Sequence, residues 1–173
     1  MESRMKLIEA MKRLRVIEKR MAANSSSITL YASSVSTEKP LFETETVQKK
    51  EVESLIQANG DLLSEYLRLK KQIEETNLRT VVTIGGIDYV ISDLLIIKRK
   101  MAGFMLRTYR ALNEEQANKR KVSASVGPDG TKAYTVRFYD EKGKNEGTRH
   151  WQDLYDNIDS RLETINALTD LIE

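Results

Sequence analysis

The side chains that most often carry catalysis or bind metals are scarce in this chain of 173 residues. His150 is the single histidine, and there is no cysteine. A zinc site needs several nitrogen or sulfur ligands, and a Ser/His/Asp triad needs a carboxylate that holds the histidine base. No second histidine, no cysteine and no paired-carboxylate motif surrounds His150, so we interpret it as a residue at the start of a helix. We therefore expect no catalytic residue, no metal site and no cofactor.

A glycine pair, Gly85-Gly86, is the next candidate because glycine-rich loops can cradle phosphate groups. The surrounding sequence has neither the lysine spacing of a Walker motif nor the pattern GxGxxG. The pair instead joins two β-branched and aromatic runs, TVVTI and IDYVI. A two-residue Gly-Gly loop supplies the positive φ angles that a tight hairpin turn requires. We predict a β-hairpin over residues 80–90, in which both glycines are purely structural.

A second turn signal, GPDG, lies within residues 122–139. Pro128 and Gly130 are typical turn residues, and β-rich runs flank them on both sides. The segment therefore predicts a second β-hairpin. Three apolar residues share one face of its second strand, where we expect contacts with a partner: Tyr134, Val136 and Phe138.

Two basic runs, KRKMAG and NKRKV, raise the question of nucleic-acid binding. Helical spacing spreads Lys98, Arg99 and Lys100 around the helix, so they do not line one groove. The whole chain carries a net charge of only +2. We therefore do not expect nucleic acid to be the main partner.

Four helices are predicted to position these residues, at about 4–22, 46–76, 92–119 and 151–172, from apolar residues at alternating spacings of three and four. We expect one core position on each helix, namely Leu14, Leu62, Met105 and Leu162. The net charges of the four helices alternate in sign, which favours antiparallel neighbours. The prediction is a mainly α fold over residues 1–173, a single domain. It would be an elongated antiparallel bundle or coiled coil of about four helices with two small β-hairpins.

The second helix has two apolar stripes. The first consists of Leu55, Asn59, Leu62, Tyr66, Leu69 and Ile73, and the second of Val52, Ile56, Leu63 and Leu67. Two adjacent stripes require partners on two sides, as in a bundle. Gly60 indicates a tolerated glycine or a kink. A sharper interpretation is that Asn59 is a buried polar residue that sets the register of the helices.

The segment 22–45 is rich in serine and threonine and closes around Pro40. Hydroxyl side chains compete with a helix by bonding to nearby backbone, so we predict an irregular or extended arm. Its ITLY run could add a strand to the exposed sheet edge of another chain. We expect contacts with a partner here too, and hence a homo-oligomer, through Ile28, Leu30 and Tyr31.

The sequence also shows no targeting or membrane signal. The amino terminus lacks the uninterrupted apolar stretch of a secretory signal, and the most apolar run, VISDLLII, is too short to span a bilayer. We expect a soluble protein of the virion or the cytoplasm and no membrane partner.

Several short motifs together resemble a family of small helical proteins of bacteria and their phages, some of which are labelled septicolysin. The motifs are an opening MKL-x-EA at Met5–Ala10, a helix ending in Thr76-Asn77, and a glycine step from Gly86 into ISDLL. The resemblance covers roughly residues 5–112 and continues loosely into the last helix. It implies a helical fold and brings no catalytic residues. This chain departs from the family in its longer second hairpin.

These observations favour a non-enzymatic structural protein that acts through self-association with copies of itself and with neighbouring structural proteins. Its most concrete form is a bacteriophage virion component, in the head decoration, the neck or the tail. Two alternatives stay open at this stage. One is a septicolysin-like membrane-active toxin, and the other is a cytosolic nucleic-acid-binding helical bundle.

Overall fold

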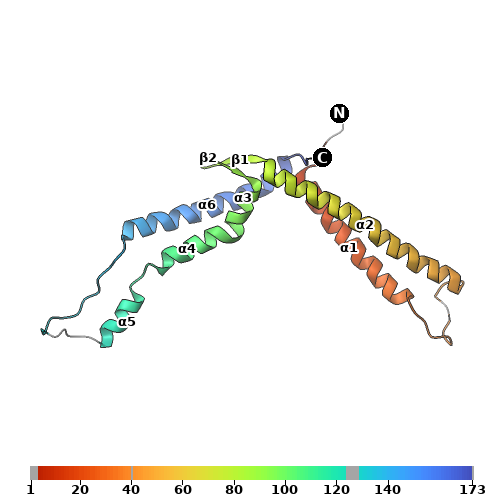
Figure 1. Cartoon of the computed structure of the whole chain (residues 1–173), viewed down its shortest axis with the longest axis horizontal. Helices are drawn as coiled ribbons and strands as arrows, with labels where there is room; N and C mark the ends of the chain where they lie inside the picture. The colour runs from red at the N-terminus through yellow and green to blue at the C-terminus, as the bar shows by residue number, and fades with distance from the viewer. Residues whose placement is uncertain (1–3, 40, 124–128, 173) are drawn as a thin grey trace. The chain divides into compact units, whose positions relative to one another are not determined.

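The computed structural model describes residues 4–39, 41–123 and 129–172. Over these ranges the chain is mainly helical and contains one two-stranded antiparallel sheet (Figure 1). It divides into two compact units, the first made of Met1–Thr80 with Glu163–Glu173 and the second of Val81–Leu162. The sequence predicted one domain, whereas the structure has two units, which are described separately.

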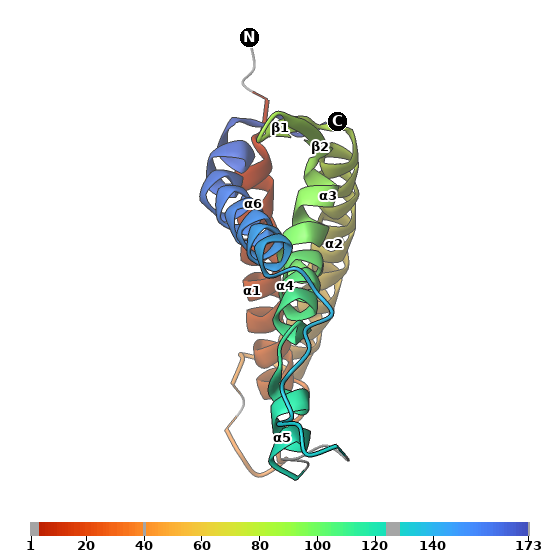
Figure 2. The same ribbon diagram turned by 90° about the vertical axis from the view of Figure 1, so that its left-hand side faces the viewer.

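The first unit is built on a hairpin of two long helices, α1 (Leu7–Tyr31) and α2 (Glu45–Arg79). Figures 1 and 2 show the two helices side by side. Their packed faces carry the heptad spacing of the sequence, and the buried apolar residues are Leu7, Ala10, Leu14, Ile17, Leu69 and Ile73. Burial of such side chains is the main stabilising term for two helices that pack along one stripe each.

Polar contacts across α1 and α2 show that the helices are antiparallel. Arg13 Nε donates to Glu65 Oε1 at 2.8 Å, and this contact lowers the pKa of the Glu65 carboxyl. Farther along α1, Asn24 Nδ2 donates to Asn59 Oδ1 at 2.9 Å. Asn59 is half-buried and bonds across the helix pair, as a residue that sets register would.

The expected irregular arm at 22–45 is wrong for its first ten residues, because α1 continues through the serine-rich segment to Tyr31. The hydroxyls of Ser25, Ser26 and Thr29 donate to backbone carbonyls four residues earlier, at 2.9, 3.1 and 3.0 Å. They are satisfied without leaving the helix, and α2 packs alongside. The ITLY run is therefore the last turn of α1 and no strand. Irregular backbone occupies only the connection to α2.

The end of the chain is bound to the first unit. Leu7 N donates to Thr169 O at 2.9 Å and Leu171 N donates to Met5 O at 2.8 Å. Lys6 Nζ lies 2.6 Å from Asp170 Oδ1. These contacts explain why the last helix, α6 (Glu141–Leu168), ends before the predicted residue 172.

The second unit begins with the hairpin of β1 (Val81–Ile84) and β2 (Ile87–Val90), in which Ile84 pairs with Ile87. Gly85 and Gly86 form its turn with φ angles of 60° and 81°. A side chain at either position would be strained at such positive φ. The backbone of the pair therefore has the conformation of a primed hairpin turn.

The helix predicted over 92–119 is instead several consecutive pieces. It starts as α3 (Ile91–Ile96), passes through one π-helical turn, η1 (Ile97–Met101), and continues as α4 (Ala102–Ala111). A break follows because Asn113 bonds to the end of α4 and to the start of α5 (Glu115–Ser123). Its Nδ2 donates to Arg110 O at 3.0 Å, and its Oδ1 accepts from Glu115 N at 2.9 Å.

The hairpin predicted over 122–139 does not appear in the described residues. Residues 122 and 123 end α5, and 124–128, which include Pro128, lie outside the described residues. Residues 133–138 have no regular secondary structure. Gly130 does adopt a turn conformation, with φ of 80°. Its neighbour Asp129 accepts a 2.6 Å hydrogen bond from the Thr131 hydroxyl.

The start of α6 also differs from the prediction, since the helix begins ten residues before Trp151. Asp140 Oδ2 accepts from Gly143 N at 2.6 Å, which is a helix cap that satisfies a free N–H of the first turn. Thr148 lies inside the helix and donates to Lys144 O at 2.8 Å.

Two of the four predicted core positions are buried and two are only half-buried. Leu14 and Leu162 are buried, while Leu62 and Met105 are half-buried. Within the second unit the buried apolar residues are Ile84, Ile91, Leu94, Ala102, Ile158 and Leu162.

Candidate interaction surfaces

Two side chains of the segment between α5 and α6 bond to residues that precede it in the chain. Thr135 Oγ1 donates to Asn118 Oδ1 at 2.8 Å, and Arg137 Nε donates to Glu114 Oε1 at 2.7 Å. Thr135 and Arg137 thus fix the segment to α5 and to Glu114, which directly precedes α5. The even-numbered residues of the same segment are exposed and apolar. We call Tyr134, Val136 and Phe138 the apolar row.

The apolar row is exposed, at 79% for Tyr134, 52% for Val136 and 94% for Phe138. An almost fully exposed phenylalanine beside an exposed tyrosine is characteristic of a surface that contacts another molecule. The three residues were predicted as partner contacts on a β-strand. The structure exposes them on an irregular segment instead.

Charged groups hold the apolar row in place. Arg137 lies between Glu114 and Glu141, and the contact with Glu114 raises the pKa of its guanidinium. The Arg137 guanidinium and the Lys144 ammonium each lie 5.5 Å from the centre of the Tyr139 ring, a cation–π distance. The segment and the α4–α5 junction enclose a pocket of about 330 Å³.

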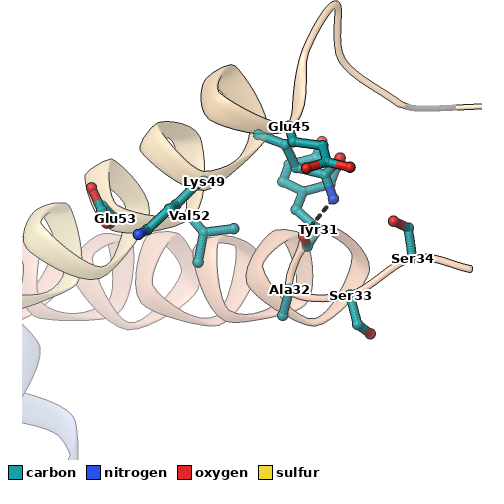
Figure 3. Close-up of a pocket in the computed structure, with 9 residues that line it drawn as sticks. Tyr31, Ala32, Ser33, Ser34, Glu45, Lys49, Val52 and Glu53 are labelled. Atoms are coloured by element: carbon teal, nitrogen blue, oxygen red, sulfur yellow. Dashed lines mark hydrogen bonds between the residues drawn. The ribbon is translucent and has the colours of Figure 1, made fainter. Parts of the chain in front are cut away.

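A second pocket, of about 430 Å³, lies at the junction between the end of α1 and the start of α2 (Figure 3). Gln48 Nε2 donates to Tyr31 O at 2.7 Å across it. Figure 3 shows Lys49 and Glu53 on α2, with Ser33 and Ser34 beyond the end of α1. These groups could bind a small polar molecule.

The other predicted partner contacts lie at the end of α1. Leu30 is 60% exposed, whereas Ile28 and Tyr31 are half-buried. The Tyr31 ring packs edge-on against Phe42 with ring centres 4.9 Å apart. Only Leu30 therefore offers a free apolar surface at this end of the helix.

Among the residues that the structure describes, His150 is not part of a group suited to metal chemistry. His150 is exposed and packs edge-on against Trp151, with ring centres 5.6 Å apart. Across the described ranges, no cluster of three or more His, Cys, Asp or Glu side chains could hold a metal ion. Of the basic residues considered for nucleic acid, Lys98 lies 2.5 Å from Asp159, and Lys119 lies 2.6 Å from Glu115.

Comparison with known proteins found no match among family models, curated proteins or solved structures. In the part of the chain that the structure describes, none of the helices combines the length and the apolar character needed to cross a membrane. The interaction surfaces themselves must therefore carry the functional argument.

Proposed function

We propose that this chain is a non-enzymatic assembly protein that acts through contacts with copies of itself and with neighbouring structural proteins. Its most concrete form is a bacteriophage virion component, in the head decoration, neck or tail, found in the virion or in the cytoplasm before assembly. The sequence resemblance to small helical bacterial and phage proteins supports this form.

The apolar row carries the proposal. Exposing two aromatic side chains and a valine to water is unfavourable, at about 25 cal/mol for each Å² of apolar surface. The segment is nevertheless held in this exposed arrangement by the hydrogen bonds of Thr135 and Arg137. Such an arrangement is useful when a partner covers the row. The exposed members of the second stripe of α2, Ile56, Leu63 and Leu67, support the same conclusion, because a bundle would be completed there by another chain.

Light scattering on the full chain tests the proposal. We expect wild-type protein to be oligomeric at about 100 μM, a concentration at which even a weak specific interface with a micromolar Kd is mostly formed. The triple variant Tyr134→Ser/Val136→Ser/Phe138→Ser should have a lower mass, because the row no longer offers apolar surface.

A matched control is Val81→Ser/Ile87→Ser, which removes exposed apolar side chains from the β-hairpin. It should leave the mass unchanged. A wild-type chain that stays monomeric at the highest concentration contradicts the proposal. Dye release from lipid vesicles, or a DNA gel shift that disappears with moderate salt, would then favour the toxin or the nucleic-acid alternative.

A further inference from the structure

One face of α2 carries a heptad pattern that is longer than its apolar stripe. Its positions follow alternating spacings of four and three, and all of them are exposed: Lys49, Glu53, Ile56, Gly60, Leu63, Leu67, Lys70 and Glu74. We call this set the outer face of α2. The apolar members are 57% exposed at Ile56, 48% at Leu63 and 51% at Leu67. The buried residues Leu69 and Ile73 belong to the other stripe, so α1 leaves the outer face uncovered.

When two copies of α2 run antiparallel, each residue of the outer face lies opposite a residue type that complements it. A two-fold axis between Gly60 and Leu63 places Ile56 opposite Leu67 of the partner subunit. The same axis places Glu53 opposite the partner's Lys70. It also places Lys49 opposite the partner's Glu74. A parallel pairing would instead set each charge against its own copy, which is unfavourable.

Gly60 gives a separate argument for a close neighbour. It lies inside α2 and is exposed, although glycine weakens a helix relative to alanine. A Cβ built on Gly60 would meet no atom within 4 Å, so packing inside the unit does not require glycine there. In the reversed pairing, Gly60 faces the partner's Leu63. A missing side chain there provides the hole that receives a leucine knob.

We propose that α2 pairs along its outer face with α2 of a second copy, antiparallel and about a two-fold axis between Gly60 and Leu63. The inference rests on the proposed function and names the surface and the orientation of one self-contact. A two-fold contact uses the same patch on both copies, as the reversed order of charges requires.

Charge exchange tests the pairing in the full chain by analytical ultracentrifugation. Glu53→Lys sets like charges against each other at two symmetric places and should weaken this contact about tenfold. The double variant Glu53→Lys/Lys70→Glu restores both pairs and should recover wild-type affinity. Lys71→Glu, an adjacent charge change outside the outer face, is the matched control and should have little effect.

Cysteine cross-linking tests the orientation and does not depend on affinity. The natural chain has no cysteine. A mixture of Ile56→Cys and Leu67→Cys chains should form the mixed disulfide under mild oxidation, because opposed core positions lie within disulfide range. Each variant alone should remain largely uncrosslinked. Self-linking of Ile56→Cys would indicate a parallel pairing and overturn the inference.

Failure of the proposed function and failure of the α2 contact give different experimental results. If the wild-type chain is monomeric at every concentration, the proposed function and this contact both fail. If the chain is oligomeric but the mixed disulfide does not form and Glu53→Lys has no effect, only the α2 contact fails. The apolar row would then account for assembly. Rescue by the double variant together with the mixed disulfide would establish the contact.

Discussion

Thr76 is the one buried polar side chain among the described residues, with 0% exposure. Its hydroxyl donates to Gln72 O at 2.7 Å and accepts from Ile172 N at 3.0 Å. One hydroxyl thus joins the end of the chain to the longest helix. The sequence marks Thr76 only through its resemblance motif, because its bonding partner is 96 residues away.

Replacing Thr76 with valine tests this link. Valine keeps the shape but leaves the Ile172 N–H without its acceptor, so Thr76→Val should destabilise the chain by about 1–3 kcal/mol. Thr76→Ser keeps the hydroxyl and should lose less. Urea unfolding of the three proteins measures the difference. Equal stability of Thr76→Val and wild type would show that the link is dispensable.

The exposure of residues that follow a short repeating pattern could be predicted from the sequence. The positions of residues that are fixed by partners far away in the chain could not. The alternation of Tyr134, Val136 and Phe138 is visible in the sequence, and the structure exposes all three. The reason for their exposure is not visible there, because Asn118 and Glu114 hold the intervening residues. The self-complementary outer face of α2 is readable from sequence alone once its charges are considered with its apolar stripe.

Helix limits were harder to predict than helix existence, and the errors have physical causes. Local propensity disfavours helix in the serine-rich end of α1 and in the glycine-containing start of α6. Tertiary packing against α2 extends the first helix, and the Asp140 cap starts the second one early. The break at Asn113 is the reverse case, in which a side chain interrupts a helix that apolar spacing would continue.

The helices α6 and α4 approach each other closely where Gly147 meets Tyr109. A Cβ built on Gly147 would overlap the ring of Tyr109, so Gly147 is required by packing. Gly147→Ala should lower stability by about 1–2 kcal/mol, since overpacking exceeds the gain in helix propensity. Gly103→Ala is the control, because its Cβ meets nothing within 4 Å. It should raise the melting temperature, while Gly147→Ala should lower it. Identical shifts would show that Tyr109 moves aside freely.

The chain has two units with separate cores, where the sequence predicted one domain with one core. The heptad spacing of the sequence describes each helix but does not say which helices share a core. Each unit has its own set of buried apolar side chains, for example Leu14 and Leu69 in the first and Leu94 and Ile158 in the second. The helix α6 passes from one unit to the other at Leu162. Local and sub-global opening can then follow the units instead of the whole chain.

Hydrogen exchange on the two destabilised variants tests whether the units open separately. Thr76→Val should speed exchange in α1 and α2 and leave the amides of α4 near their wild-type rates. Gly147→Ala should do the reverse, because the overlap with Tyr109 lies in the second unit. The amides of α6 on either side of Leu162 provide an internal comparison, since each half should respond to the variant of its own unit. If both variants raise exchange equally along the whole chain, the molecule unfolds as one cooperative body and the division into two units has no energetic meaning.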